Sequence, residues 1–257
     1  MGMVSVPLAV QTLTNAAVVK VAKIILTKKL TENLPVIKNI TFDLDGTLID
    51  SFKTIYKTTE KVLQRLGVSK PLDEQEFYKR IGHHFIDIFK ELDIPVTDFN
   101  GFIEIYKQYY FDFIGESTFY SGLINVLEFL KSEEIAISLL TTKGQDQADK
   151  IIDYFNLREY FSLVMGRRID IANKPSAEPL LIICKELNVK PEETLMVGDT
   201  ELDIQCGKNA GTKTCGCFYG YRSKEVLKEE KPDFLISEIT ELLKIVYEEN
   251  LSSEKLA

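Results

Sequence analysis

The order of apolar and polar positions divides the chain into regions of different periodicity. Residues 36–42 form a run rich in β-branched and aromatic side chains, which is typical of a strand. From residue 51 to about residue 120 the apolar positions instead recur at helical spacing, and glycines and prolines interrupt them repeatedly. This second region is therefore expected to fold as several short helices, with no strand among them.

Further along the chain, strand and helix patterns alternate. Apolar runs of strand length occur at 135–140, 162–165, 194–197, 212–218 and 233–236. Helical patterns occur at 145–155, 177–187, 202–210 and 238–247. Such alternation predicts a parallel sheet covered by helices on both faces. The expected fold class is α/β, with a Rossmann-like three-layer core (36–50 and 119–250) and an inserted small α-helical cap domain (51–118).

The first 31 residues differ in composition from the rest of the chain. They contain no Asp or Glu and carry four lysines, and apolar residues recur at helical spacing from 16 to 30. Residues 1–35 are therefore expected to form an N-terminal extension with an amphipathic helix, packed on the domain or on a partner subunit. Polar residues interrupt the apolar stretch and no positive charge precedes it, which argues against a membrane span and a signal peptide.

Charge and cysteine usage exclude some classes of partner. The formal net charge is -8 at pH 7, whereas binding to a nucleic-acid backbone requires clustered Lys and Arg, so no nucleic-acid partner is expected. The four cysteines show neither zinc-site spacing nor the density of a secreted disulfide framework, which favours free thiols and a cytoplasmic location. Cys215 and Cys217 can share one face of a strand, where a redox role is conceivable, but small buried hydrophobes are the simpler interpretation.

Polar residues follow four of the predicted strands or lie in the loops after them. The four clusters are Asp43 with Asp45, Thr141 with Thr142, Lys174, and Asp199 with Asp203. Each alone has an ordinary structural interpretation as a turn, a helix cap or a solvated side chain. A parallel sheet, however, brings the carboxyl ends of its strands together. The clusters are therefore expected to converge on one site.

The converging residue types match the needs of phosphoryl transfer. That reaction requires a nucleophile, a proton donor for the leaving group, a cation and fixed hydrogen-bond donors. Asp43 is a competent carboxylate nucleophile, and Asp45 can donate and later accept a proton. Asp199 suits Mg²⁺ and Asp203 completes or orients its shell, while Thr141 offers a hydroxyl and Lys174 a charge.

The sequence resembles the haloacid dehalogenase superfamily of phosphatases in the motifs Asp43-Leu44-Asp45-Gly46-Thr47, Thr141, Lys174 and Gly198-Asp199-Thr200-Glu201-Leu202-Asp203. The resemblance implies that Asp43 is the nucleophile, Asp45 the acid and base, Thr141 a phosphate ligand and Lys174 a charge anchor. It implies that Mg²⁺ is held by the carboxylates of Asp43 and Asp199 and the backbone carbonyl of Asp45, with Asp203 in support. Phosphate contacts are further expected from Gly46, Thr47, Thr142 and Lys143.

Within that superfamily the chain is most similar to phosphoglycolate phosphatases, which have a helical cap of the first type. The similarity lies in Thr141-Thr142-Lys143, in residues 174–180 and in Tyr219-Gly220-Tyr221. Thr142 departs from the usual Asn, but its backbone N–H still suits phosphate. In the cap, Arg80, His83 and His84 fall where the resemblance implies a substrate-specificity loop, although a loop histidine facing solvent is an equally simple interpretation.

The resemblance implies a Mg²⁺-dependent phosphatase acting on a small phosphorylated metabolite such as phosphoglycolate. A pyrophosphatase, a sugar-phosphate phosphatase and a β-phosphoglucomutase-like phosphotransferase share the same motifs and stay as alternatives. The acid at Asp45 argues against carbon–halogen cleavage, in which that second Asp is lacking. A noncatalytic interaction protein on this scaffold is a remote alternative. The assembly is expected to be a monomer or a homodimer.

Overall fold

The computed structural model describes residues 37–252, so the extension expected over residues 1–35 lies outside the described part of the chain. Within that part, six parallel strands form one sheet in the order β5-β4-β1-β6-β7-β8. The strands are β1 (Asn39–Phe42), β4 (Ala136–Gly144), β5 (Leu163–Arg167), β6 (Thr194–Gly198), β7 (Lys213–Cys217) and β8 (Phe234–Ile236). The sheet confirms the predicted α/β fold class.

Strand β1 lies in the middle of the sheet, where the winding of the chain changes direction. It pairs in parallel with β4 on one side and with β6 on the other. After β1 the chain builds β4 and β5 outward, then returns to place β6 on the opposite side. A crevice opens at the carboxyl ends of the strands at such a point, and ligands bind there in open α/β sheets.

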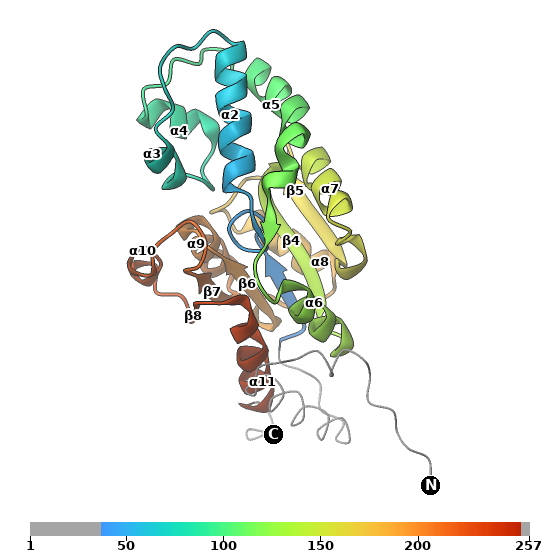
Figure 1. Cartoon of the computed structure of the whole chain (residues 1–257). Coiled ribbons are helices and arrows are strands. Elements are labelled where there is room, and N and C mark those ends of the chain that lie inside the picture. The colour runs from blue at the N-terminus through green and yellow to red at the C-terminus, as the bar shows by residue number, and fades with distance from the viewer. Residues whose placement is uncertain (1–36, 253–257) are drawn as a thin grey trace.

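Both faces of the sheet are covered because successive strand residues point to opposite sides. Leu139 packs into one buried cluster and Leu140 into the other. Helices α6 (Leu123–Ser132), α7 (Gln145–Tyr154) and α11 (Leu242–Ser252) contribute to the first side, and α8 (Glu178–Glu186) and α9 (Glu201–Ala210) to the second (Figure 1). A further helix, α10 (Lys224–Glu229), follows β7.

Four helices form an insertion between β1 and β4, which we call the cap. They are α2 (Phe52–Arg65), α3 (Glu74–Tyr78), α4 (Phe85–Glu91) and α5 (Phe99–Phe113), and Figure 1 shows them together beyond one end of the sheet. Helix α5 buries Phe102, Tyr106 and Tyr110, which recur every four residues along one face. The rings of Phe102 and Phe89 meet edge to face at 4.9 Å. The aromatic run of α5 therefore forms cap core.

Several elements differ from the sequence prediction. The region expected to lack strands contains β3 (Thr118–Phe119), which pairs with β2 (Ile49–Asp50) at the base of the cap. Two residues are too few to leave a periodic pattern, and their pairing is set by the tertiary fold. Helices α6 and α10 were not predicted either, although α6 buries Leu123, Val126, Leu127 and Leu130 at helical spacing.

The described part of the chain contains no helix of sufficient length and apolar character to span a bilayer. The four cysteines are buried and free, as the composition suggested.

Candidate active site

The loop after β1 carries Asp43 at the centre of the sheet. The Asp43 N–H donates to the carbonyl of Val197 at 2.9 Å, so the backbone still follows the sheet where the side chain enters the crevice. Gly46 follows with φ at 86°, a conformation that glycine adopts readily. A Cβ added at Gly46 would lie 2.3 Å from Oδ2 of Asp199. Only glycine therefore lets this loop approach the carboxyl end of β6 so closely.

Lys174 links two of the predicted carboxylates. Its Nζ donates to Oδ1 of Asp43 at 2.7 Å and to Oδ1 of Asp203 at 2.5 Å. The remaining donor reaches the carbonyl of Leu140 at 3.2 Å, in the neighbouring strand β4. The side chain is only 3% exposed. All three protons of the ammonium group are thus satisfied inside the protein, which fixes its position between the strands.

Asp43, Asp199 and Asp203 form a compact cluster of acids. One carboxylate oxygen from each lies within 4.8 Å of those of the other two. Oδ1 of Asp199 accepts from Thr47 Oγ1 at 2.9 Å, and Oδ2 accepts from the Tyr221 N–H at 2.8 Å. The carboxylates are therefore held by the surrounding loops rather than by their mutual contacts.

Thr200 holds the third member of the cluster. Oδ2 of Asp203 accepts from both the N–H and the hydroxyl of Thr200, at 3.0 and 2.6 Å. Asp203 is the third residue of α9, so this contact forms a capping box at the helix N-terminus. The same two residues therefore start the helix and position a carboxylate.

The electrostatics of the cluster favour a bound cation. Burial raises the pKa of Asp43 to about 7, although Lys174 opposes the shift. Burial also raises the pKa of Asp199 well above its ordinary value, and the nearby charges of Asp43 and Asp203 add to it. Burial alone would lower the pKa of Lys174, but the two carboxylates beside it raise it well above its usual range. One ammonium group does not balance three buried acids, and their hard oxygen ligands suit Mg²⁺.

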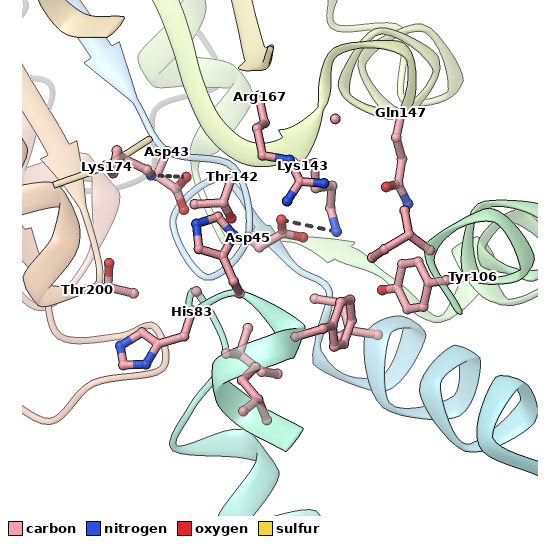
Figure 2. A pocket seen from close by; sticks show the side chains of 18 of the residues that line it. Asp43, Asp45, His83, Tyr106, Thr142, Lys143, Gln147, Arg167, Lys174 and Thr200 are labelled. Atoms are coloured by element: carbon pink, nitrogen blue, oxygen red, sulfur yellow. Dashed lines mark hydrogen bonds and ion pairs between the residues drawn. The ribbon is translucent and has the colours of Figure 1, made fainter. Parts of the chain in front are cut away.

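Asp45 lies beside the cluster without belonging to it. Its Oδ1 accepts from the hydroxyl of Ser51 at 2.5 Å, and its Oδ2 lies 3.3 Å from Nζ of Lys143. Lys143 in turn stands over the ring of Tyr110, with its Nζ 4.5 Å from the ring centroid. Figure 2 shows the Asp45 carboxylate between Asp43 and Tyr106 of the cap. Asp45 is thus placed to meet a group that projects away from Asp43.

A pocket between the core and the cap brings most of the predicted residues together. It is lined by Asp43, Asp45, Gly82, His83, His84, Thr142, Lys143 and Lys174. Thr47 instead holds Asp199, as described above. Thr141 is buried within β4, where its hydroxyl accepts from the Lys143 N–H at 3.3 Å.

Two of the predicted cap residues, His83 and Arg80, make contacts away from the centre of the pocket. Nε2 of His83 forms a hydrogen bond with Oε1 of Glu201 on the core. Arg80 lies outside the pocket and pairs within the cap with Glu76 and Glu91. Burial alone would raise the pKa of Glu201, but the hydrogen bonds from His83 and Arg222 lower it to about 2. His83 therefore joins the cap to a carboxylate of the core.

The pocket also contains residues that sequence reasoning missed. Arg167 ends β5, Gln147 lies in the first turn of α7, and Tyr106 faces inward from α5. Arg167 lies two residues beyond the predicted strand 162–165. A longer predicted strand would have placed Arg167 among the strand ends that converge. Gln147 and Tyr106 lie within helices and carry no comparable signal.

Four motif loops meet at the carboxyl edge of the parallel sheet, where a lysine lies among buried acids. This arrangement defines a phosphoryl-transfer enzyme of the α/β type. The model of the haloacid dehalogenase-like hydrolase family matches residues 40–217, more than half of the chain. The chain therefore belongs to the haloacid dehalogenase-like hydrolases, as the sequence motifs implied.

Relatives named for particular activities match over most of the chain. The chain is 34% identical over 213 residues to a phosphoglycolate phosphatase of Aquifex aeolicus, a match that spans 80% of this chain and 95% of the relative. It is 30% identical over 215 residues to the pyrophosphatase PpaX of Listeria monocytogenes, spanning 83% and 98% respectively. The chain is therefore an enzyme of the phosphatase type within its family.

A solved structure has the same fold. A haloacid dehalogenase-like family protein of Streptococcus pneumoniae superimposes with a TM-score of 0.73 at 24% sequence identity. The match covers 82% of this chain and 98% of that protein. The likeness supports the six-stranded core with its helical insertion.

Proposed function

We propose that the chain is a Mg²⁺-dependent phosphatase that hydrolyses a small phosphomonoester through an aspartyl phosphate on Asp43. The observation that carries the proposal is the contact of Lys174 with Asp43 at 2.7 Å inside a buried cluster of three acids. A purely structural cluster would leave an unfavourable excess of buried negative charge. Binding of a cation and of a phosphate-bearing substrate accounts for the cluster.

In the proposed first step an oxygen of Asp43 attacks phosphorus, and the bond from phosphorus to the leaving oxygen breaks. Asp45 gives its proton to that oxygen. In the second step Asp45 takes a proton from water, the water oxygen attacks phosphorus, and inorganic phosphate leaves with Asp43 regenerated. Lys174 keeps Asp43 oriented during both steps, and Thr141 and the N–H groups near Thr142 offer donors to the phosphate oxygens.

The carboxylates of Asp43 and Asp199 would hold Mg²⁺ together with the backbone carbonyl of Asp45, with Asp203 in support. When bound, the ion supplies positive charge that offsets the charge of the carboxylates and of the phosphate oxygens. The charge of the bound ion explains why acids whose pKa values are raised by burial can act as carboxylates at neutral pH.

Phosphoglycolate is one of two equal substrate candidates, because relatives named as a phosphoglycolate phosphatase and as a putative pyrophosphatase are each 34% identical to the chain. Pyrophosphate is the second, because another relative is named as a pyrophosphatase. Sugar phosphates and a mutase reaction on a sugar phosphate stay as further hypotheses. All of them share the same attack by Asp43 and differ only in the leaving or accepting group.

The test is release of inorganic phosphate from a panel of phosphoglycolate, pyrophosphate, hexose phosphates and p-nitrophenyl phosphate, with Mg²⁺ or with EDTA. We expect turnover that requires Mg²⁺. Asp43→Asn should abolish it, while Asp50→Asn, which alters an exposed carboxyl next to the cap, should retain it. Hydroxylamine should release phosphate from denatured enzyme, as expected for an acyl phosphate. No hydrolysis of any member of the panel, or full activity of Asp43→Asn, would refute the proposal.

A further inference from the structure

Two buried side chains on the cap side of the pocket have polar atoms without a partner. The Tyr106 hydroxyl and Nε2 of Gln147 make no hydrogen bond with any residue in the described part of the chain. The two residues are only 3% and 6% exposed, respectively. Buried polar groups in proteins are nearly always hydrogen-bonded, so two orphaned groups in one pocket point to a ligand.

Arg167 is a third polar side chain in this pocket without a carboxylate partner among residues 37–252. The lysines of the pocket are all paired, since Lys107 contacts Asp146, Lys143 contacts Asp45 and Lys174 contacts Asp43. Arg167 is exposed at the end of β5 and lines the same cavity. Its positive charge is therefore available to a ligand.

The position of the three residues relative to Asp45 indicates which part of a substrate they meet. In Figure 2, Asp43 and Lys174 lie to the left of Asp45, Gln147 and Tyr106 lie to its right, and Arg167 lies directly above it. The phosphoryl group reacts at Asp43, and Asp45 protonates the oxygen that leaves. Whatever is attached to that oxygen projects beyond Asp45, toward these three side chains.

The three side chains share one chemical character, because each presents a hydrogen-bond donor. Burial raises the pKa of Tyr106 well above its ordinary value, and the charge of Asp45 adds to the shift, so the phenol keeps its proton. Nε2 of Gln147 is an amide donor, and Arg167 carries a permanent charge on a planar fork that matches a carboxylate or a phosphate. Donors without acceptors favour an oxyanion over a neutral hydroxylated group.

We propose that Arg167, Gln147 and Tyr106 form a leaving-group subsite that binds a second oxyanion, a carboxylate or a phosphate, carried by the leaving group. The inference rests on the proposed phosphatase function and narrows its substrate class. It favours phosphoesters of small hydroxy acids and pyrophosphate over esters of neutral sugars. The subsite combines a strand end and a helix of the core with a helix of the cap, so a bound oxyanion also joins the two parts.

The test compares substrates that differ only in the second anion. Phosphoglycolate and pyrophosphate carry it, whereas ethyl phosphate is the analogue of phosphoglycolate without its carboxylate. Arg167→Gln should lower kcat/KM for the anionic substrate by about 10- to 100-fold, and Tyr106→Phe by about 10-fold, as expected for lost hydrogen bonds to a charged group. With ethyl phosphate the same variants should change kcat/KM by less than about threefold. The anionic substrate that shows the loss identifies the oxyanion as carboxylate or phosphate.

Stability supplies a second readout for Tyr106→Phe. Its hydroxyl has no partner among residues 37–252, so removing it should leave Tm unchanged or raise it while the activity falls. A merely structural tyrosine would lose stability and activity together. Arg167→Lys should recover part of the loss of Arg167→Gln, because it restores the charge without the fork.

Two matched controls are available in the chain. Arg168→Gln removes the neighbouring arginine, which donates to Gln145 instead, and Tyr109→Phe removes a hydroxyl from the same helix outside the pocket. Both should keep the preference for the anionic substrate. Equal losses with ethyl phosphate, or no loss with either anionic substrate, would overturn the subsite while leaving the phosphatase intact. A wild-type enzyme that hydrolyses no phosphoester at all would instead refute the proposed function and, with it, the subsite.

Discussion

Lys174 shows how a single side chain can serve both the fold and the proposed chemistry. Its ammonium group is 3% exposed and contacts Asp43, Asp203 and the carbonyl of Leu140. Burying an ion is unfavourable unless its partners compensate, and here two carboxylates and a carbonyl do so. Removing the lysine would leave both acids with an uncompensated buried charge.

We therefore predict that Lys174→Met lowers the free energy of unfolding by about 3–5 kcal/mol in Mg²⁺-free buffer, the usual effect of breaking a buried ion pair from one side. Urea denaturation followed by circular dichroism measures the change. Adding Asp203→Asn should restore part of the stability, because it removes one of the two unpaired acids. Lys150→Met, at an exposed position of α7, is the control and should stay within about 0.5 kcal/mol of wild type. Wild-type stability of Lys174→Met would contradict this account.

At the scale of single residues, the sequence predicts which side chains take part in the chemistry. It predicts the contacts of each side chain less well. Asp43 and Lys174 stand in patterns that can be recognised without a structure, and the fold brings them to 2.7 Å. Tyr106 and Gln147 carry no such pattern, since an aromatic and an amide in helices are ordinary residues. Only the packing of the cap on the core shows that their polar atoms lack partners.

Among the elements, the loop between β1 and β2 sets the geometry of the site. It must turn sharply after Asp43 and still pass close to Asp199 and Tyr221. Gly46 makes this possible in two ways, through its positive φ of 86° and through the missing Cβ. Gly67, after the end of α2, also has a positive φ, of 71°, but an added Cβ there would meet nothing within 4 Å. Substitutions at the two glycines therefore separate the effect of a positive φ from the effect of crowding by an added Cβ.

We predict that Gly67→Ala costs about 1–2 kcal/mol of stability, the usual penalty for the left-handed conformation, and leaves phosphatase activity near that of wild type. Gly46→Ala should cost more and also lower kcat/KM by at least about 100-fold, because it displaces the Asp199 carboxylate from the acid cluster. Thermal unfolding and a phosphate-release assay give the two values for each variant. Equal activities of the two variants would show that crowding at Gly46 is not important for the site.

The elements themselves were predictable where apolar runs are long and bounded by turns. Strand β6 begins at Thr194 as expected, and α7 begins at Gln145. Strands β4 and β5 run further than predicted, to Gly144 and Arg167, because their polar ends do not fit an apolar pattern although the backbone stays extended. Pairing of β2 with β3 joins residues about 70 positions apart, which no local pattern specifies.

At the scale of the whole molecule, the function depends on how the cap meets the core. His83 of the cap contacts Glu201 of the core across 118 positions of sequence, and Arg222 holds the same carboxylate at 2.8 Å. The Tyr78 hydroxyl donates to the carbonyl of Gly220 at 3.2 Å. These contacts form on the side of the pocket next to the acid cluster, so they favour the arrangement in which the cap lies against the core, which we call the closed cap. Sequence reasoning placed His83 in a specificity loop but gave no indication of its partner.

We predict that His83→Ala raises KM for the preferred substrate by about 10-fold with a smaller change in kcat, because the closed cap is populated less often and the apparent affinity falls by that fraction. The core should keep its stability, since Arg222 still pairs with Glu201. Steady-state kinetics and urea denaturation test the two statements. His83→Gln should recover part of the affinity through its amide donor.

Lys79→Gln breaks an exposed pair with Glu76 inside the cap and should leave KM unchanged. If it raises KM as much as His83→Ala does, the effect comes from weakening the cap itself and not from its contact with the core.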